Sequence, residues 1–473
     1  MKKIKFILVT EALIMFLFLG CIICGCENKE KSISINTKEK NESDIGLKLD
    51  EYMKAYNENC SYKYSGTILV AKGDEILLNK GYGMANYKEN VPNNSNSVFA
   101  IGSITKSFTA VGIMQLQEKG LLNVDDPISK YIEGHKRGDD ITIHHLLTHT
   151  SGIKREGMFL GREEVPLDRN IDYINKNSLL FEPGEDYSYS NAGYNILAAI
   201  IEKVSGKSYN DYIRDNILIP LEMNTSRCGI DDSYVDNQSI GYEILTNDPK
   251  ILSIYNFSCI TGGGNIYSTV EDLYKYDRAL YPEKLLNKES LEKIFTPHWG
   301  DCSYGYGYGW EITERFRHRK INHGGCIGGG GYNSMIIRYP DDDYVLIFLT
   351  NNSDHTALYA VFDSMEAIIF EEDYIMPEKI KTVDVNSEIL KEYAGEYEFG
   401  EGFIVTVTFN NGKLYSDADD GNIYELFPIT EKDFYYENHE CTRDEFIMDK
   451  NNNVVGLKIS NNTRVFEGKK IKE

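Results

Sequence analysis

The chain has 473 residues and a formal net charge of −23, with 41% hydrophobic and 26% charged residues. This composition is ordinary for a globular protein with a sizeable core, and a polyanion repels phosphate backbones, so nucleic-acid binding is disfavoured. At roughly 100–200 residues per domain, the length predicts two or three domains, or one large domain and a small one.

The N-terminus has the pattern of an export signal. Three lysines among the first five residues precede an uncharged, mostly apolar run over 12–25. The run is short for a membrane span, which needs about 20 residues. Its end, Ile23-Cys24-Gly25-Cys26, resembles a bacterial lipoprotein cleavage site with Cys26 as the lipidated residue, and Cys21 is a competing position. We therefore expect a lipoprotein-type signal peptide over 1–26, with an uncleaved anchor or plain secretion as alternatives. Each places the body outside the cytoplasm, in the first case tethered to the outer face of the membrane.

Residues 27–46 are polar and charged, which is typical of a flexible tether. A globular pattern begins at 47. Two pairs of β-rich runs flank turn residues, one pair near each end of 47–372, and helical patterns lie between them. Strands at both ends with helices between predict an α+β domain whose sheet brings its ends together. The expected hairpins cover 67–78 and 333–350, and the expected helices include 103–119, 192–205 and 355–371.

A different texture follows a predicted linker over 373–387. Short β-rich runs alternate with turn signals, among them 403–409 followed by Asn411-Gly412. This pattern predicts a small all-β domain over 388–473, a barrel or a sandwich.

Metal and cofactor sites are not expected. The cysteines outside the signal region are widely spaced with no CxxC pair, so zinc and redox motifs are unsupported, although a disulfide or two remains open. His144, His145 and His149 have no carboxylate between them, and no Walker or GxGxxG pattern fits the glycines.

Ser-x-x-Lys occurs three times, and the surroundings separate the copies. Ser290–Lys293 lies on an ordinary charged helix surface, and Ser151–Lys154 contains Gly152, which suggests a turn. Ser103–Lys106 begins a strongly apolar helical segment. Because residues i and i+3 share a helix face, a partly desolvated Lys106 could act as the base for Ser103. A buried helix with an incidental serine and lysine is the alternative.

Two further stretches carry polar groups suited to catalysis. Tyr189 precedes Ser190 and Asn191 just before a helix, where a tyrosine can relay a proton and an asparagine can grip an amide. Asn191 could also cap that helix. His323 opens a glycine-rich stretch up to Gly331, which suits a strand edge against which a substrate lies.

These three motifs together resemble those of the β-lactamase-like serine hydrolases, which include class C β-lactamases, D-alanyl-D-alanine carboxypeptidases, D-aminopeptidases and related esterases. The resemblance covers about 50–370 and includes the stretches 141–152, 261–264 and 304–310. It implies a β-lactamase/transpeptidase-like fold, an antiparallel sheet flanked by a helical subdomain. The tail from 388 resembles the small β-domain that follows the hydrolase domain in many relatives.

The resemblance also implies a role for each motif residue. Ser103 would form an acyl-enzyme, Lys106 would deprotonate it, and Tyr189 would shuttle protons. Asn191 would orient Lys106 and the substrate amide, His323 and Gly325 would line the far wall, and the backbone N–H groups of Ser103 and Cys326 would form the oxyanion hole.

One departure bears on the substrate: class C β-lactamases carry a lysine where this chain has His323. Histidine there is more similar to the carboxypeptidase, aminopeptidase and esterase branches. We expect a serine hydrolase without metal or cofactor that acts on a D-amino-acid or peptidoglycan-type peptide. An esterase or weak β-lactamase is the nearest alternative, and a non-catalytic wall-binding or β-lactam-sensing protein is an alternative of another class.

Overall fold

The computed structural model describes residues 38–472 apart from short gaps at 156–162, 230–235, 244–248, 253–255, 282–283, 302, 401–402, 419–422, 437–438 and 462. The predicted signal peptide and Cys26 lie outside the described residues. Within them, no helix has the length and hydropathy needed to cross a bilayer. The described chain forms two compact units, Tyr64–Phe362 and a second that combines the residues up to Lys63 with those from Asp363 onward.

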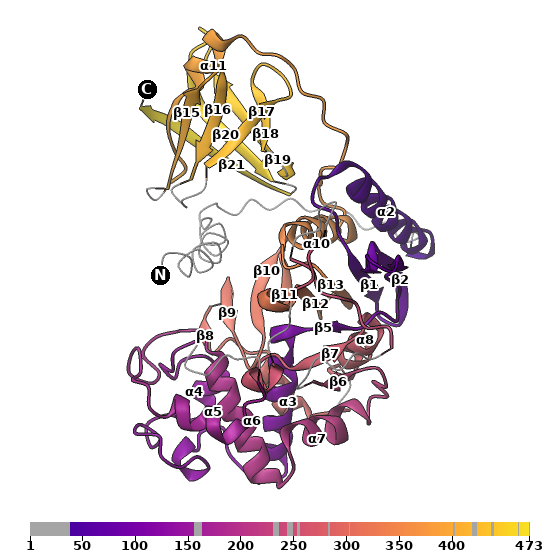
Figure 1. The fold of residues 1–473 in the computed structure, drawn as a ribbon, viewed down its shortest axis with the longest axis vertical. Coiled ribbons are helices and arrows are strands. Elements are labelled where there is room, and N and C mark those ends of the chain that lie inside the picture. Colours follow the sequence, from indigo (N-terminus) through magenta and orange to yellow (C-terminus); the bar gives the residue numbers. More distant parts are fainter. Residues whose placement is uncertain are drawn as a thin grey trace. The chain divides into compact units, whose positions relative to one another are not determined.

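The first unit is built on an eight-stranded sheet with the order β2-β1-β13-β12-β11-β10-β9-β8 (Figure 1). Its paired strands are all antiparallel, and β1 pairs with β13, so strands from the two ends of the unit lie side by side near one edge of the sheet. Both predicted hairpins are confirmed. The strands are β1 (Gly66–Lys72), β2 (Glu75–Tyr82), β8 (Trp299–Gly300), β9 (Tyr304–Tyr306), β10 (Glu311–Arg315), β11 (His318–Ile327), β12 (Tyr332–Tyr339) and β13 (Tyr344–Thr350).

Helices of this unit pack around α3 (Thr105–Glu118), which contacts α6 (Asn191–Ser205) and α7 (Tyr209–Ile213) (Figure 1). Every α3 residue from Thr105 to Leu116 is buried, as expected of a helix without a polar face. The remaining elements are β3 (Met84–Asn86), β4 (Val91–Pro92), β5 (Phe99–Ala100), η1 (Gly102–Ile104), η2 (Ile128–Lys130), α4 (Ile143–Leu147), α5 (Leu167–Ile174), η3 (Arg214–Leu218), β6 (Arg227–Cys228), η4 (Phe257–Ile260), β7 (Ile266–Ser268), α8 (Val270–Ala279), α9 (Lys288–Ile294), η5 (Gly328–Gly330) and α10 (Thr356–Ile369), which continues into the second unit.

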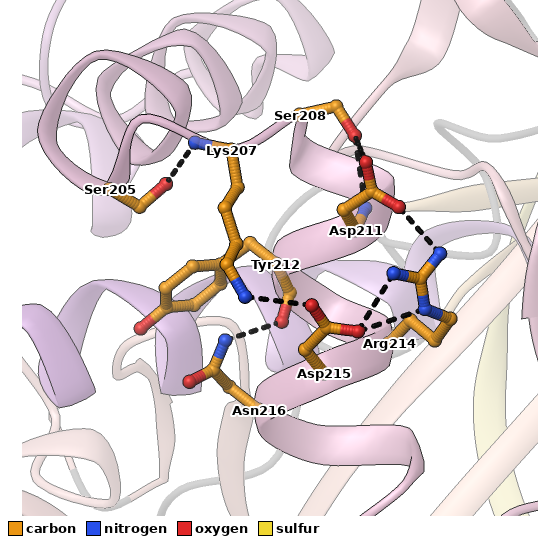
Figure 2. A network of polar contacts seen from close by, with 8 residues as sticks. All are labelled: Ser205, Lys207, Ser208, Asp211, Tyr212, Arg214, Asp215 and Asn216. Carbon is orange, nitrogen blue, oxygen red and sulfur yellow. Dashed lines mark hydrogen bonds and ion pairs between the residues drawn. The ribbon is translucent and has the colours of Figure 1, made fainter.

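A charged network covers the outer side of α7 where it passes into the π-helical turn η3 (Figure 2). Arg214 bridges Asp211 and Asp215, and Asp215 also pairs with Lys207 at 2.7 Å. These side chains are exposed or half-exposed, so water screens each pair and its contribution to stability is small. The inner side of α7 matters more to the site, because the Tyr209 hydroxyl lies 2.7 Å from the Thr109 hydroxyl on α3.

The second unit contains a closed barrel of eight antiparallel strands preceded by α11 (Ser387–Tyr393) (Figure 1). The predicted all-β domain is therefore a barrel. Asn411 and Gly412 both have positive φ and join β15 to β16 in a two-residue hairpin, as Asn-Gly commonly does. The barrel strands are β14 (Gly395–Glu398), β15 (Ile404–Asn410), β16 (Lys413–Asp417), β17 (Ile423–Pro428), β18 (Asp433–Tyr436), β19 (His439–Met448), β20 (Val454–Asn461) and β21 (Arg464–Lys472).

The same unit includes helix α2 (Lys38–Asn59), which begins inside the segment predicted as a tether. Its buried residues recur at helical spacing and explain why the chain folds earlier than its polar composition suggests. The predicted linker also has partners: the Asn59 side chain donates to the Pro377 carbonyl, and the rings of Tyr52 and Tyr374 lie 6.0 Å apart. The buried α2 side chains are Ile45, Leu49, Tyr52, Met53 and Tyr56.

A carboxyl group is buried inside the barrel at Asp444, which is fully inaccessible to solvent. The Tyr436 hydroxyl donates to Oδ2 at 2.8 Å, whereas Oδ1 has no hydrogen-bond partner among the described residues. Burial raises the pKa of Asp444 to about 7. The folded barrel therefore holds this proton more tightly than the unfolded chain.

This burial predicts that barrel stability falls as pH rises from about 4 through 7, by at most about 4 kcal/mol for a shift of three pKa units. Asp444→Asn should match the parent near pH 4 and unfold at a higher temperature at pH 8. Tyr436→Phe removes the donor to the carboxylate and should extend the decline to higher pH. Thermal unfolding at a series of pH values measures both, and a parent protein as stable at pH 8 as at pH 4 would contradict the prediction.

Candidate active site

Ser103 lies in the η1 turn, where two backbones come into close contact. Gly102 has a φ of 51°, and a Cβ added to it would lie 2.9 Å from the backbone nitrogen of Cys326. A Cβ on Gly325 would lie 2.0 Å from the carbonyl oxygen of Ile101. Glycine is required at both positions, and the contact brings the backbone of β11 beside the turn that carries Ser103.

Lys106 extends from the first turn of α3 toward three oxygen atoms, and its side chain is fully buried. Nζ lies 3.0 Å from Ser103 Oγ, 2.7 Å from Asn191 Oδ1 and 2.8 Å from the Gly263 carbonyl oxygen. An amide or peptide oxygen can only accept a hydrogen bond. A neutral amine would thus donate its two hydrogens to Asn191 and Gly263 and offer its lone pair to the Ser103 hydroxyl.

The surroundings of Lys106 favour that neutral form. Burial lowers its pKa well below the ordinary value of 10.5, and the positive charge of Arg155 lowers it further. Asn191 and Gly263 present dipoles rather than full negative charges, so they do not restore a charged ammonium as a carboxylate would. The arrangement suits a lysine that accepts a proton from Ser103.

Asn191 is the first residue of α6, but it does not cap the helix. The cap is Ser190, whose hydroxyl accepts from the Gly193 N–H at 3.0 Å. Of the two roles considered for Asn191 from the sequence, capping is excluded, and its side chain contacts Lys106 instead.

Tyr189 stands beside Lys106, with Nζ 4.8 Å from its ring centre. The Arg155 guanidinium lies over the same ring at 5.3 Å. His149 holds the Tyr189 loop on both sides, because the Ser188 N–H donates to its carbonyl and the Ser190 N–H donates to its Nδ1, each at 3.0 Å.

His323 lies on β11 at the far side of the site and is almost completely buried. Its Nδ1 is 2.7 Å from the Gly324 carbonyl and its Nε2 is 3.1 Å from the Tyr306 hydroxyl. Burial and the nearby Lys106 lower the pKa of His323 to about 3, so this wall is uncharged at neutral pH. Cys326 is exposed, and only its backbone faces the Gly102 turn.

The structure thus brings together all the residues predicted for the site: Ser103, Lys106, Tyr189, Asn191, His323, Gly325 and Cys326. The other two Ser-x-x-Lys copies do not form such a pair. Lys154 is exposed and contributes only its backbone carbonyl, which accepts from Ser190 at 3.2 Å, and Lys293 pairs with Glu289 at 3.1 Å. Sequence reasoning missed His149, Arg155, Gly263 and Tyr306 as site residues. The first, third and fourth fall in stretches that carried the family resemblance, which was the available signal. In the part of the chain that the structure describes, no cluster of histidine, cysteine and carboxylate side chains could hold a metal ion.

Comparison with known proteins agrees with this geometry. A family model described as Beta-lactamase matches residues 49–361, and a domain of unknown function (DUF3471) matches residues 380–471. The chain is 33% identical over 401 residues to "Penicillin-binding protein 4*" of Bacillus subtilis (strain 168), covering 79% of this chain and 88% of that protein. It is 26% identical over 308 residues to the "Teichoic acid D-alanine hydrolase" of Staphylococcus aureus (strain MRSA252), covering 64% and 73%. The solved octameric penicillin-binding protein homologue from Pyrococcus abyssi superposes with a TM-score of 0.62 at 28% identity, covering 89% of this chain and 99% of that one.

The first site prediction concerns Gly102. Gly102→Ala introduces a Cβ against the Cys326 nitrogen and a strained positive φ, so we expect phosphonylation of Ser103 by a fluorophosphonate to slow by about 100-fold. Gly120→Ala is a matched control, since Gly120 has a φ of 67° with open space around it. It should lose stability but keep the labelling rate, and equal rates for both variants would refute the role given to Gly102.

The second site prediction concerns the proton on Lys106. Lys106→Arg places a permanent cation beside Ser103 and should slow labelling by about 100- to 10,000-fold. Lys293→Arg, in the surface Ser-x-x-Lys copy, should leave it unchanged. In the parent, the rate should rise with pH and level off well below 10.5, because the deprotonated amine is the reactive form. A rate that still climbs at pH 10.5 would contradict a neutral Lys106.

Proposed function

The chain belongs to the Beta-lactamase family as a penicillin-binding-protein-like serine hydrolase, and we propose that Ser103 is its nucleophile and a D-amino-acid or peptidoglycan-type peptide its substrate. The observation that carries the proposal is the contact of a fully buried Lys106 amine with Ser103 Oγ at 3.0 Å. No metal or cofactor takes part in the steps below.

The proposed reaction begins with attack of Ser103 Oγ on the substrate carbonyl while its proton passes to Lys106 Nζ. The backbone N–H groups of Ser103 and Cys326 would stabilise the oxyanion. Tyr189 would pass the proton held by Lys106 on to the leaving nitrogen or oxygen. When water hydrolyses the acyl-enzyme, Tyr189 would relay a proton from the water to Lys106, which returns it to Ser103 Oγ as the acyl–oxygen bond breaks. Asn191 would keep Lys106 directed at Ser103 and grip the substrate amide.

A second candidate is favoured by the neutral far wall. A D,D-carboxypeptidase substrate ends in a free carboxylate, and class C β-lactamases place a lysine where His323 stands. Both ring nitrogens of His323 already have partners, and its pKa of about 3 leaves it uncharged. This favours an ester or amide whose leaving group carries no carboxylate on that side. The relative named as a teichoic acid D-alanine hydrolase supports the same direction.

The export signal expected at the N-terminus supports a substrate outside the cytoplasm. We propose that the body is held at the outer face of the membrane through a lipid on Cys26, where wall peptides and wall polymers are within reach. Labelling with a fatty-acid probe, lost in Cys26→Ala, would support this anchor, and retention of the label would assign it to another residue such as Cys21.

The first functional measurement is mass spectrometry of the full chain after reaction with a fluorophosphonate or a penicillin, beside Ser103→Ala. We expect a probe adduct on Ser103 that is absent from the variant. The absence of any adduct on folded protein would contradict the proposal and favour a non-catalytic wall-binding or β-lactam-sensing protein.

A matched set of substrates then separates the two candidates. The set contains a D-Ala-D-Ala peptide with a free carboxylate, the same peptide capped as an amide, and a D-alanyl ester. A kcat/KM at least 10-fold higher for the free carboxylate would support carboxypeptidase activity. Equal or higher values for the capped peptide or the ester would support the second candidate.

A further inference from the structure

A chain of hydrogen bonds runs behind the site between two backbone groups. It starts at the Ser190 N–H, which donates to Nδ1 of His149 at 3.0 Å. Nε2 of His149 lies 3.2 Å from the Tyr306 hydroxyl, which lies 3.1 Å from Nε2 of His323. Nδ1 of His323 ends the chain at the Gly324 carbonyl, 2.7 Å away. The three side chains are at most 2% exposed.

The two ends of this chain fix the hydrogens between them. A backbone N–H can only donate, so Nδ1 of His149 must accept, and its hydrogen lies on Nε2, which donates to Tyr306. A carbonyl can only accept, so Nδ1 of His323 must carry a hydrogen. In the neutral ring, Nε2 of His323 then accepts from the Tyr306 O–H. The two histidines therefore hold opposite tautomers, and the Tyr306 hydroxyl receives one hydrogen bond and gives one.

We propose that Tyr306 is a positioning residue that links the Tyr189 loop to the β11 wall through two neutral histidines of opposite tautomer. Through His149 it fixes the loop that carries Tyr189 and Asn191. Through His323 it fixes the strand that carries Gly325 and Cys326. Two of the site's three motifs are thus held in register by one hydroxyl of a side chain that is 1% exposed.

The hydrogen-bond chain also disfavours protonation of either histidine. A proton on Nδ1 of His149 would face the Ser190 N–H, setting donor against donor. A proton on Nε2 of His323 would face an O–H that already donates there. Besides each other, the groups acting on the two histidines are the Lys106 amine, which opposes their protonation, and the positive Arg155. The groups acting on the Tyr306 hydroxyl are Glu311 and the tyrosines at 187, 189 and 194. Burial is the largest cause of the low pKa of each histidine.

An independent sign of constraint is the backbone of His149, whose φ is 62°. This left-handed conformation is uncommon outside glycine and persists where surrounding contacts determine it. Here it directs both the carbonyl and the ring of His149 at the Tyr189 loop. The ring centres of His149 and Tyr189 lie 4.3 Å apart.

The consequence for catalysis rests on the proposed function, whereas the hydrogen-bond pattern does not. Two imidazolium groups this close to Lys106 would turn the site strongly cationic. Kept neutral, they leave Arg155 as the nearby positive charge acting on Lys106. The hydrogen-bond chain therefore maintains both the position of Tyr189 and an uncharged His323 wall over the working pH range.

The direct test is long-range proton–nitrogen NMR of the full chain labelled with ¹⁵N-histidine, with His149→Gln and His323→Gln for assignment. We expect hydrogen on Nε2 of His149 and on Nδ1 of His323, and no imidazolium at pH 5.5. The same tautomer in both rings, or a charged ring at that pH, would overturn the proposal whatever the enzyme's activity.

The kinetic test compares Tyr306→Phe with Tyr308→Phe. Tyr308 is an equally buried tyrosine two residues on, whose hydroxyl bonds Nδ1 of His144 at 2.8 Å. Both variants lose one tyrosine–histidine hydrogen bond. We expect Tyr306→Phe alone to lower kcat/KM by about 10- to 100-fold and to shift its acid limb to higher pH, because His323 loses the O–H that disfavours its protonation.

Fluorophosphonate labelling of Ser103 in the parent distinguishes failure of the proposed function from failure of the positioning role of Tyr306. If the parent reacts and Tyr306→Phe matches Tyr308→Phe in rate and pH profile, the positioning role is wrong while the proposed function stands. If the parent does not react, the proposed function fails. The histidine tautomers measured by NMR then test the hydrogen-bond chain independently of activity.

Discussion

The burial of the Lys106 amine is the constraint on which the rest of the structure depends. A lysine without solvent contact is stable only when its charge is neutralised or its hydrogens find acceptors. Here the acceptors are an amide oxygen and a peptide carbonyl, and the third neighbour is a serine hydroxyl that donates to the amine. None of the three carries a full negative charge. The group therefore remains a hydrogen-bonded amine poised to take a proton, rather than half of an ion pair.

Segments far apart in the sequence bring those groups to Lys106. Helix α3 is buried on all sides and carries Lys106 into the interior. Thr109, one turn further along, donates to the Gly262 carbonyl, which fixes the loop whose next carbonyl accepts from Lys106. The Ser190 cap starts α6 so that Asn191 points at the same amine. The glycines at 102 and 325 then allow β11 to lie against the serine turn without side chains between them.

Most acidic side chains in the described part of the chain lie at the surface, whereas the groups around Lys106 are positive or neutral. The chain carries a net charge of −23, yet the groups that act on Lys106, His149 and His323 are positive or neutral. Acidic residues gather in exposed networks such as that of Asp211 and Asp215, where water screens them (Figure 2). Keeping carboxylates away from Lys106 preserves its low pKa, and the neutral histidines avoid adding a competing cation beside it.

Local patterns in the sequence were enough to predict the α+β domain and a small all-β domain, because alternation, helical spacing and Asn-Gly turns are local. They left a barrel and a sandwich open. The seven site residues followed from the resemblance of three short motifs to a known family. The local patterns placed the end of the tether too late, since the apolar face of α2 is spread over several turns. Only the tertiary structure decided that Ser190 rather than Asn191 caps α6, that Gly263 completes the Lys106 environment, and that Tyr306 joins His149 to His323. The Ser190 cap itself joins residues three apart, but the alternative partner of Asn191 is Lys106, 85 residues away. The contacts of Gly263 and Tyr306 join residues 17 to 157 positions apart, and no single segment encodes such a contact or the direction of its hydrogen bond.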